Sequence, residues 1–161
     1  MQPRNVYLDN NATTPLHPEV KNTLIEAMEN YGNPSSLHQF GRYSRNKVEG
    51  ARERISSFIG ADPDEIIFVG SGSEANNTVL SSLTCQPVGH CEIGCQNTSV
   101  LTTNIEHPCI LESAKCLRDR GMAVGFLDVD GEGKVDLEQY KQMINPQTGL
   151  VSVMMANNET G

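Results

Sequence analysis

Basic residues are scarce in this chain, and its beginning contains no long apolar run. Lysine and arginine number 12 against 20 acidic residues, which gives a formal net charge of −8. A nucleic-acid-binding surface needs a basic face, so the composition argues against that class of function. The opening residues MQPRNVYLDNN hold no apolar stretch. We therefore expect neither a secretory signal nor a membrane span.

The cysteines also bear on the compartment. There are 5, an odd number, and no secretory signal precedes them. This combination favours reduced thiols in a cytoplasmic setting. Cys116 falls within the apolar pattern of an expected helix, which predicts a small buried residue. Cys109 lies in the first turn of the same helix, where the helix dipole favours a thiolate. For this residue, a reactive thiol is therefore the alternative to an inert one.

The apolar patterns alternate between two periods along the chain. They predict helices over 18–31, 39–59, 74–83 and 108–117 and around 137–144, and strands over 66–69, 99–103, 122–127 and 150–155. Strands that alternate with helices indicate an α/β fold in three layers, with a mostly parallel sheet covered on both faces.

The segment EIIFVGSGSEANNTV, residues 65–79, predicts a strand, a Gly/Ser loop and the start of a helix. Free backbone N–H groups at a helix start attract anions, and glycine lets the loop backbone approach a ligand. The segment matches neither the P-loop nor G-x-G-x-x-G. A phosphate cradle and an ordinary turn with a serine N-cap remain the two interpretations.

Two later strands also end in polar loops. Residues 99–103 run into Asn-Ile-Glu-His-Pro at 104–108, and residues 150–155 run into Ala-Asn-Asn-Glu-Thr-Gly at 156–161. In open α/β sheets, ligands bind beyond the carboxyl ends of the strands. An anion cradle, a histidine and an amide pair at one edge suit a flat, phosphorylated ligand.

Five segments in order resemble one family. They are VYLDNNATTPL, YGNPSSLHQFG, FVGSGSEANN, EHP and VSVMMANNETG. Together they resemble the cysteine desulfurases of the nitrogen-fixation type, which are pyridoxal 5'-phosphate (PLP) enzymes of the class V aminotransferase group. Selenocysteine lyases look similar. The resemblance is weak only around 84–98. It implies that 1–15 is an N-terminal segment and 16–161 the first part of an incomplete type I PLP-dependent transferase large domain.

The resemblance assigns roles to particular residues. Gly72 and Ser73 would hold the PLP phosphate, although the family usually has alanine and threonine there. His107 would stack on the pyridine ring and assist proton transfer, and Asn158 would donate its amide to the pyridine 3-oxygen. Residues 10–12 would lie near the substrate. The implied reaction converts L-cysteine to alanine and an enzyme-bound persulfide. A sulfur acceptor or iron–sulfur scaffold protein would be the partner, and the complete enzyme a homodimer.

Other groups that the family needs would lie downstream. The lysine that forms a Schiff base with PLP and the cysteine that accepts sulfur follow the Asn-Asn-Glu loop in the family, whereas this sequence ends at Gly161. We expect roughly the first two-fifths of such an enzyme, inactive by itself. A selenocysteine lyase, a non-catalytic module and half of a split enzyme are the alternatives.

Metal binding is a competing interpretation at two places. Cys85, His90, Cys91 and Cys95 are close enough for zinc to be conceivable, but structural zinc sites use two separated ligand pairs, so a surface loop is favoured. The segment from Asp128 begins like a calcium loop but has glutamine where glutamate is required, which favours a strand-to-helix turn. We predict no metal site.

Overall fold

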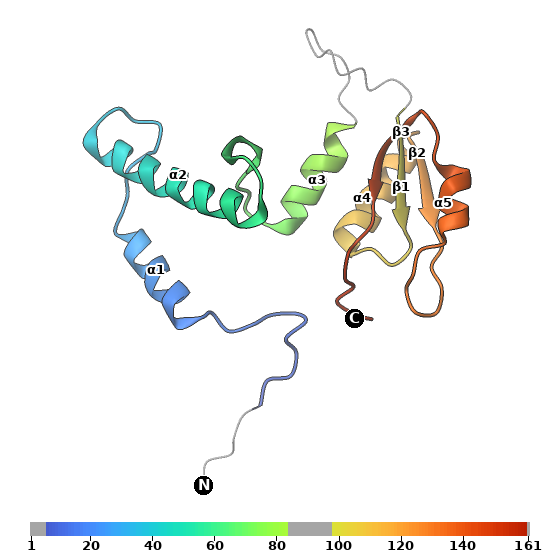
Figure 1. Cartoon of the computed structure of the whole chain (residues 1–161), viewed down its shortest axis with the longest axis horizontal. Helices are drawn as coiled ribbons and strands as arrows, with labels where there is room; N and C mark the ends of the chain where they lie inside the picture. The colour runs from blue at the N-terminus through green and yellow to red at the C-terminus, as the bar shows by residue number, and fades with distance from the viewer. Residues whose placement is uncertain (1–5, 84–97, 161) are drawn as a thin grey trace. The chain divides into compact units, whose positions relative to one another are not determined.

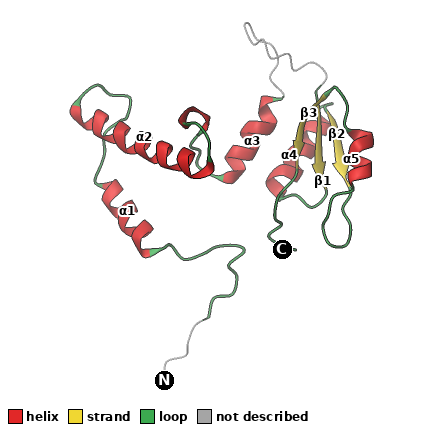
Figure 2. Ribbon diagram, in the orientation of Figure 1, coloured by secondary structure: helices red, strands yellow, loops and turns green. Residues whose placement is uncertain are grey.

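The fold comes from a computed structural model that describes residues 6–83 and 98–160. The chain divides into two compact units, Met1–Phe68 and Val69–Gly161. Figure 1 traces the elements in chain order, and Figure 2 shows helices and loops in the first unit and a sheet with helices in the second. Within the described ranges, no helix is both long and apolar enough to cross a bilayer.

The helices of the first unit begin and end where local signals place them. Helix α1 (Pro18–Met28) begins with proline, whose fixed φ suits the first helical position. Helix α2 (Gln39–Ile59) ends at Gly60, which adopts a left-handed conformation with φ 72°. A short 3-10 helix, η1 (Pro63–Glu65), follows and is stabilised by a capping box.

A close approach fixes the entry into α2. A Cβ atom added at Gly41 would overlap the carbonyl oxygen of Ser36 and lie 2.7 Å from that of Asn33. Tyr31 and Phe40 stack with ring centroids 5.6 Å apart. The Gly-Asn-Pro-Ser-Ser loop therefore lies directly against the first turn of α2, and only glycine fits at position 41.

The predicted apolar stripe of α1 is present but is not buried. No α1 residue is buried in the structure, and Met28 is 79% exposed. The periodicity thus predicted the helix correctly, while the first unit itself offers that stripe no covering surface.

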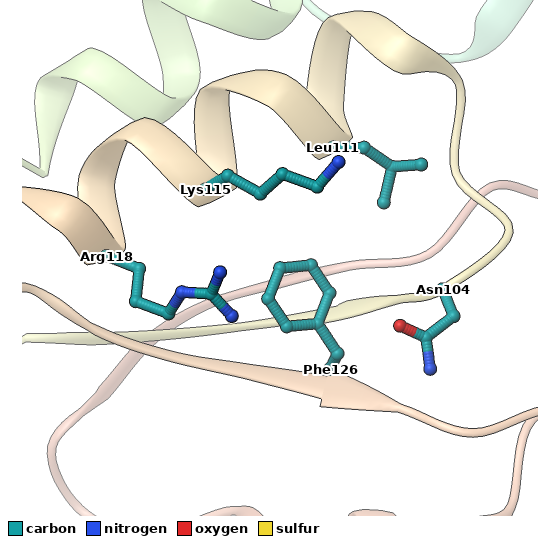
Figure 3. Close-up of a pocket in the computed structure, with 5 residues that line it drawn as sticks. All are labelled: Asn104, Leu111, Lys115, Arg118 and Phe126. Carbon is teal, nitrogen blue, oxygen red and sulfur yellow. The ribbon is translucent and has the colours of Figure 1, made fainter.

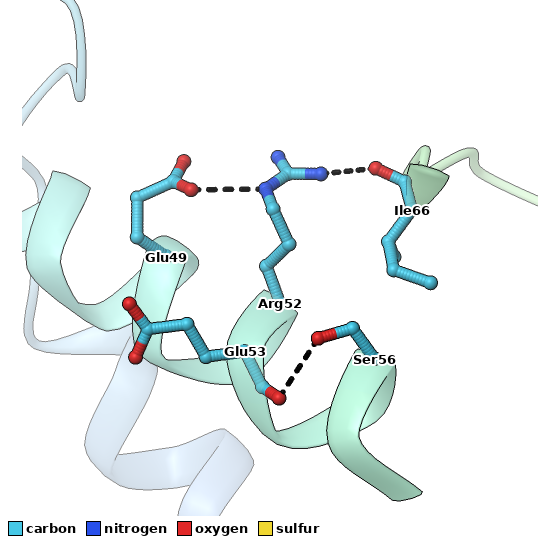
Figure 4. A network of polar contacts seen from close by, with 5 residues as sticks. All are labelled: Glu49, Arg52, Glu53, Ser56 and Ile66. Carbon is cyan, nitrogen blue, oxygen red and sulfur yellow. Dashed lines mark hydrogen bonds and ion pairs between the residues drawn. The ribbon is translucent and has the colours of Figure 1, made fainter. Parts of the chain in front are cut away.

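The strand predicted over Ile66–Val69 is not formed. These residues belong to no strand, and the Ile66 carbonyl oxygen accepts a hydrogen bond from Arg52 instead. Figure 4 shows Arg52 between this carbonyl and Glu49, whose carboxylate lies 3.0 Å from the guanidinium Nε. The Arg52 guanidinium also lies over the ring of Phe68, 4.9 Å from its centroid. The apolar pattern produced an extended segment, but a strand also needs a neighbouring strand to pair with.

The second unit is built on a parallel sheet. Its strands are β1 (Ser99–Thr103), β2 (Ala123–Leu127) and β3 (Thr148–Ser152), in the spatial order β2-β1-β3. Both pairings are parallel, and a register irregularity separates Ser99 from Val100 in the pairing with β3. The central strand β1 is buried over four of its five residues. The parallel α/β fold predicted from the sequence is confirmed.

Helices cover both faces of this sheet. On one face Val100 packs with Leu80 of α3 (Gly72–Ser82) and with Ile110 and Leu117 of α4 (Pro108–Asp119).

The opposite face meets α5 (Leu137–Met143), and a Cβ atom at Gly125 would overlap Met143 there. Since neighbouring strand residues point to opposite faces, α4 and α5 lie on opposite sides, as Figure 1 shows. Because β1 and β3 are parallel neighbours in the sheet, their carboxyl ends lie side by side.

The prediction that Cys116 is a core residue is wrong. Cys116 is exposed, whereas Ile110, Ala114 and Leu117 of the same helix are buried. At about 100° per residue, Cys116 lies roughly 120° away from Ile110 around the helix axis. It therefore falls on the solvent-facing side of α4.

Candidate functional site

The start of α3 presents open backbone donors. The helix begins at Gly72, two residues before the predicted start, with Ser71 as its N-cap; the Ser71 hydroxyl accepts from the Glu74 N–H at 3.1 Å. Gly72 and Ser73 thus occupy the first helical turn, where N–H groups have no intrahelical partner. A Cβ atom at Gly72 would meet nothing within 4 Å. The space beside the Gly72 Cα is therefore open.

His107 is held at the start of α4. It is the N-cap of the helix, and its Nδ1 accepts from the Cys109 N–H at 3.2 Å. A backbone N–H can only donate, so this geometry assigns the imidazole proton to Nε2. The ring is exposed, and Pro108 follows it at the first helical position.

The Asn-Asn-Glu loop after β3 is shaped by Asn157. The Asn157 side-chain oxygen accepts from the N–H groups of Glu159 at 2.7 Å and Thr160 at 3.0 Å. Its amide nitrogen donates to the Ile105 carbonyl at 2.7 Å. Asn158, the residue selected from the sequence, is exposed and donates to the Glu159 carboxylate at 3.0 Å. Asn157 therefore positions the loop, and Asn158 is left at its surface.

Glu106 forms a second tie between the loops. Its side chain is buried, with 6% of the residue exposed, and its Oε1 accepts from the Met154 N–H at 2.5 Å. The Thr103 hydroxyl donates to the same oxygen at 3.5 Å. Glu106 and Asn157 thus join the segments that follow the neighbouring strands β1 and β3. Sequence reasoning missed both residues. Asn157 carries a local signal, because asparagine side chains often accept hydrogen bonds from the backbone two residues later in a turn, but Glu106 carries none.

A third set of contacts connects α3 with α4. The Asn76 amide donates to the Cys109 Sγ at 3.2 Å, and the Ser113 hydroxyl donates to the Asn77 side-chain oxygen. Ser73 precedes Asn76 by about one helical turn, or roughly 4.5 Å of rise. These contacts bring the start of α3 to the end of the unit that carries the His107 loop and the Asn157–Asn158 loop.

The four predicted site residues, Gly72, Ser73, His107 and Asn158, all lie in the second unit. Their segments are joined by the side chains of Asn76, Cys109, Glu106 and Asn157. Residues 10–12 belong to the first unit.

A separate hollow lies between α4 and β2. Its volume is about 290 Å³, and its lining residues are Asn104, Leu111, Lys115, Arg118 and Phe126. Figure 3 shows Arg118 reaching from α4 toward the ring of Phe126, with its guanidinium 5.5 Å from the ring centroid, while Lys115 extends along α4 toward Leu111. None of the predicted site residues lines this hollow. Its two cations make it a competing place for a phosphate group.

The loop that begins at Asp128 is closed by side chains. The Gln139 amide accepts from the Asp128 N–H at 2.7 Å and donates to its carboxylate at 2.9 Å. The Asp130 carboxylate accepts from the N–H groups of Glu132 and Lys134. These hydrogen bonds hold the Asp130 pKa below its ordinary value of 3.8. In the described part of the chain, no three His, Cys, Asp or Glu residues are grouped to hold a metal. The cluster Cys85, His90, Cys91 and Cys95 lies outside it.

Comparison with known proteins identifies the family. The family described as Aminotransferase class-V matches residues 6–161. A cysteine desulfurase from Trichormus azollae is 39% identical over 158 residues, which are 97% of this chain and 38% of that protein. A mitochondrial cysteine desulfurase from Saccharomyces cerevisiae is 41% identical over 160 residues, which are 98% of this chain and 31% of that protein. The chain thus spans about one-third to two-fifths of these relatives.

Solved structures agree with the sequence comparison. A NifS-like protein superposes with a TM-score of 0.86 at 35% identity, over 96% of this chain and 41% of that protein. A structure described as SspA in complex with cysteine gives a TM-score of 0.85 at 29% identity, over 95% of this chain and 43% of that protein. Because the family match extends over nearly the whole sequence, the chain belongs to the class V aminotransferase family.

Proposed function

We propose that this chain is the N-terminal part of a PLP-dependent cysteine desulfurase and that it supplies the phosphate-binding end of the cofactor site. The observation that carries the proposal is the joining of the loops after β1 and β3 by Glu106 and Asn157, at the end where α3 begins. Membership of the class V aminotransferases and likeness to curated cysteine desulfurases support it.

The residues at this end fit PLP in charge and shape. N–H groups of the first helical turn at Gly72 and Ser73, with open space beside the Gly72 Cα, suit a dianionic phosphate. The exposed ring of His107 is free to stack on a pyridine, and the Asn158 amide is a donor for its 3-oxygen. PLP, when bound, supplies an electron sink for bonds at the substrate α-carbon. In this chain, the α3 start binds the phosphate, and His107 orients the ring and handles a proton at Nε2.

The substrate and partners follow from the same proposal. One similar structure is described as a complex with cysteine, and we propose L-cysteine as the substrate. Sulfur would pass through an enzyme-bound persulfide to an acceptor or iron–sulfur scaffold protein. The complete enzyme would act as a homodimer in the cytoplasm. Some curated relatives are mitochondrial, so cell fractionation tests the compartment.

We propose further that this chain alone does not turn over cysteine. The described lysines of the second unit are paired with carboxylates: Lys115 with Glu112, Lys134 with Glu132 and Lys141 with Glu138. None of them lies in the loops that carry the predicted site, and the remaining two lysines, Lys21 and Lys47, lie in α1 and α2 of the first unit. Borohydride should therefore trap no PLP on one preferred lysine, and incubation with cysteine should yield no sulfide. Stoichiometric labelling of one lysine together with turnover would contradict this.

Binding at the α3 start is tested with the 161-residue chain by NMR titration. PLP should shift the Gly72 and Ser73 amide signals to saturation, whereas pyridoxal, which lacks the phosphate, should not. Ser73→Ala removes a hydrogen bond to a charged group, so PLP affinity should fall about 10- to 100-fold.

Ser82→Ala is the matched control, because it removes a serine hydroxyl at the other end of α3. Shifts that gather instead around Arg118 and disappear in Arg118→Ala would assign the phosphate to the hollow and contradict the proposal.

A further inference from the structure

Cys109 contacts His107 through two atoms. Besides the backbone N–H, the Cys109 Sγ lies 3.0 Å from the His107 Nδ1. On its other side, the same sulfur accepts from the Asn76 amide nitrogen at 3.2 Å. A line of polar contacts therefore runs from α3 through the thiol to the imidazole.

The hydrogens of this line have one consistent arrangement. The Asn76 amide can only donate to sulfur through its N–H, and Nδ1 is already an acceptor for the Cys109 N–H. The thiol hydrogen then points to Nδ1 as a second donor. Every donor in the line points toward His107, so Nδ1 stays unprotonated and the opposite ring nitrogen, Nε2, carries the proton.

Packing holds the thiol in place. Cys109 is half-buried and packs against the cluster of Leu80, Val100, Ile110 and Leu117. The imidazole itself is exposed. An exposed ring is free to rotate unless something fixes it. Here its Nδ1 edge is anchored to the half-buried Cys109, while its Nε2 edge faces away from Cys109.

We infer that Asn76 and Cys109 form a positioning pair that fixes the tautomer and the ring orientation of His107. The inference deepens the proposed function, because a fixed Nε2–H is what an imidazole facing a cofactor needs in order to donate or return a proton. Neither residue needs to touch the cofactor. They act through His107, and removing either one should weaken the hold on its Nδ1, to which the Cys109 backbone N–H still donates.

The test reads the ring directly and requires no PLP. Histidine-labelled ¹⁵N NMR of the 161-residue chain, at a pH where the ring is neutral, reports the proton on each nitrogen. The unmodified chain should show His107 with Nε2 protonated. Cys109→Ala and Asn76→Ala each remove a hydrogen bond, so the ratio of the two tautomers should shift toward Nδ1–H by about five-fold.

Two further variants separate positioning from packing. Cys109→Ser keeps a donor and acceptor at the same place and should restore most of the original ratio. Ser113→Ala removes the neighbouring contact between α4 and Asn77 without touching the line, so His107 should not respond. Amide spectra of the remaining residues show whether each variant is folded.

Some results would overturn the inference. An unchanged His107 spectrum in both Cys109→Ala and Asn76→Ala would show that the thiol does not position the ring, as would a ring protonated at Nδ1 in the unmodified chain. If His107 responds as expected but PLP binds nowhere, the positioning pair stands and the proposed function fails. If PLP binds at Ser73 but the His107 spectrum does not change in Cys109→Ala, the proposed function stands and the positioning pair fails.

Discussion

The two units of this chain differ in what their apolar residues contact. In the second unit, β1 is buried between two layers of helices, and Leu127 of β2 is fully buried. In the first unit, α1 buries no residue and α2 buries only Gly41 and Ser56. The second unit therefore has a core of its own, whereas the first is specified mainly by caps, a tight loop and the Arg52 contacts. Helical periodicity is equally clear in both, so it does not reveal which helices have a core to cover.

The largest expected effect tests this contrast in burial. Leu127→Ala should destabilise the second unit by about 2–5 kcal/mol, because it empties a fully buried position. Met28→Ala, at a 79% exposed position of α1, should change stability by less than about 0.5 kcal/mol. Hydrogen exchange of β1 and α1 amides measures each unit separately. Equal losses from the two substitutions would show that α1 is covered in solution.

The next effect tests whether close approach specifies the first unit. Gly41→Ala places a methyl group against the backbone oxygens of Ser36 and Asn33, so it should cost about 1–3 kcal/mol. Gly50→Ala lies in the same helix, and its Cβ would meet only the end of Arg54, at 3.8 Å. That substitution should stabilise α2 by about 0.5–1 kcal/mol, since alanine is the better helix former.

Circular dichroism melts of the two variants provide the measurement. If Gly41→Ala also stabilises α2, the Gly-Asn-Pro-Ser-Ser loop is not held against the helix. The two units would then differ even more in how they are stabilised, because the first unit would lose the tight loop as a source of stability.

The smallest effect concerns one turn of the second unit. The N–H groups of Lys134 and Glu132 hold the Asp130 pKa below its ordinary value of 3.8. Because the pKa is lowered in the folded chain, the ionised carboxylate stabilises the turn at any pH above the pKa of the unfolded chain. This stabilisation is lost as the pH falls through the lowered pKa of the folded chain. The amide shifts of Glu132 and Lys134 should therefore change together in acid, below about pH 3.8. Asp130→Asn should remove the response, and a change centred above pH 5 would contradict it.

Sequence reasoning succeeded where the signals are local. The bounds of α2 were predicted correctly at both ends, because Gly60 provides a clear stop and the apolar repeat is regular. The strands of the sheet were predicted to within three residues at each end, and the bounds of β1 without error. The family resemblance gave Gly72, Ser73, His107 and Asn158, and the structure brings their segments to one end of the unit.

Apart from Cys116, whose position around its own helix was misjudged, the failures depend on contacts between distant residues. The run at Ile66–Val69 is apolar enough for a strand, but whether it pairs is decided by other parts of the chain. Glu106 and Asn157 form hydrogen bonds with partners 48 and 52 positions away, respectively. The residues next to them in the sequence do not indicate those partners. In the sequence Cys109 is an isolated thiol, and only the fold brings Asn76 into contact with it.

The central place of β1 has a consequence for folding. Ser99 pairs with Ala123 on one side and with Thr148 on the other, so the second pairing closes a loop twice as long. Doubling a loop costs about 0.6 kcal/mol more in closure entropy, and longer loops close more slowly. We expect β1, α4 and β2 to assemble first, together with the contact between Cys109 and His107. Strand β3 then docks last and brings the Asn157–Asn158 loop with it, so the end of the sheet that carries the candidate site is completed only in the final folding step.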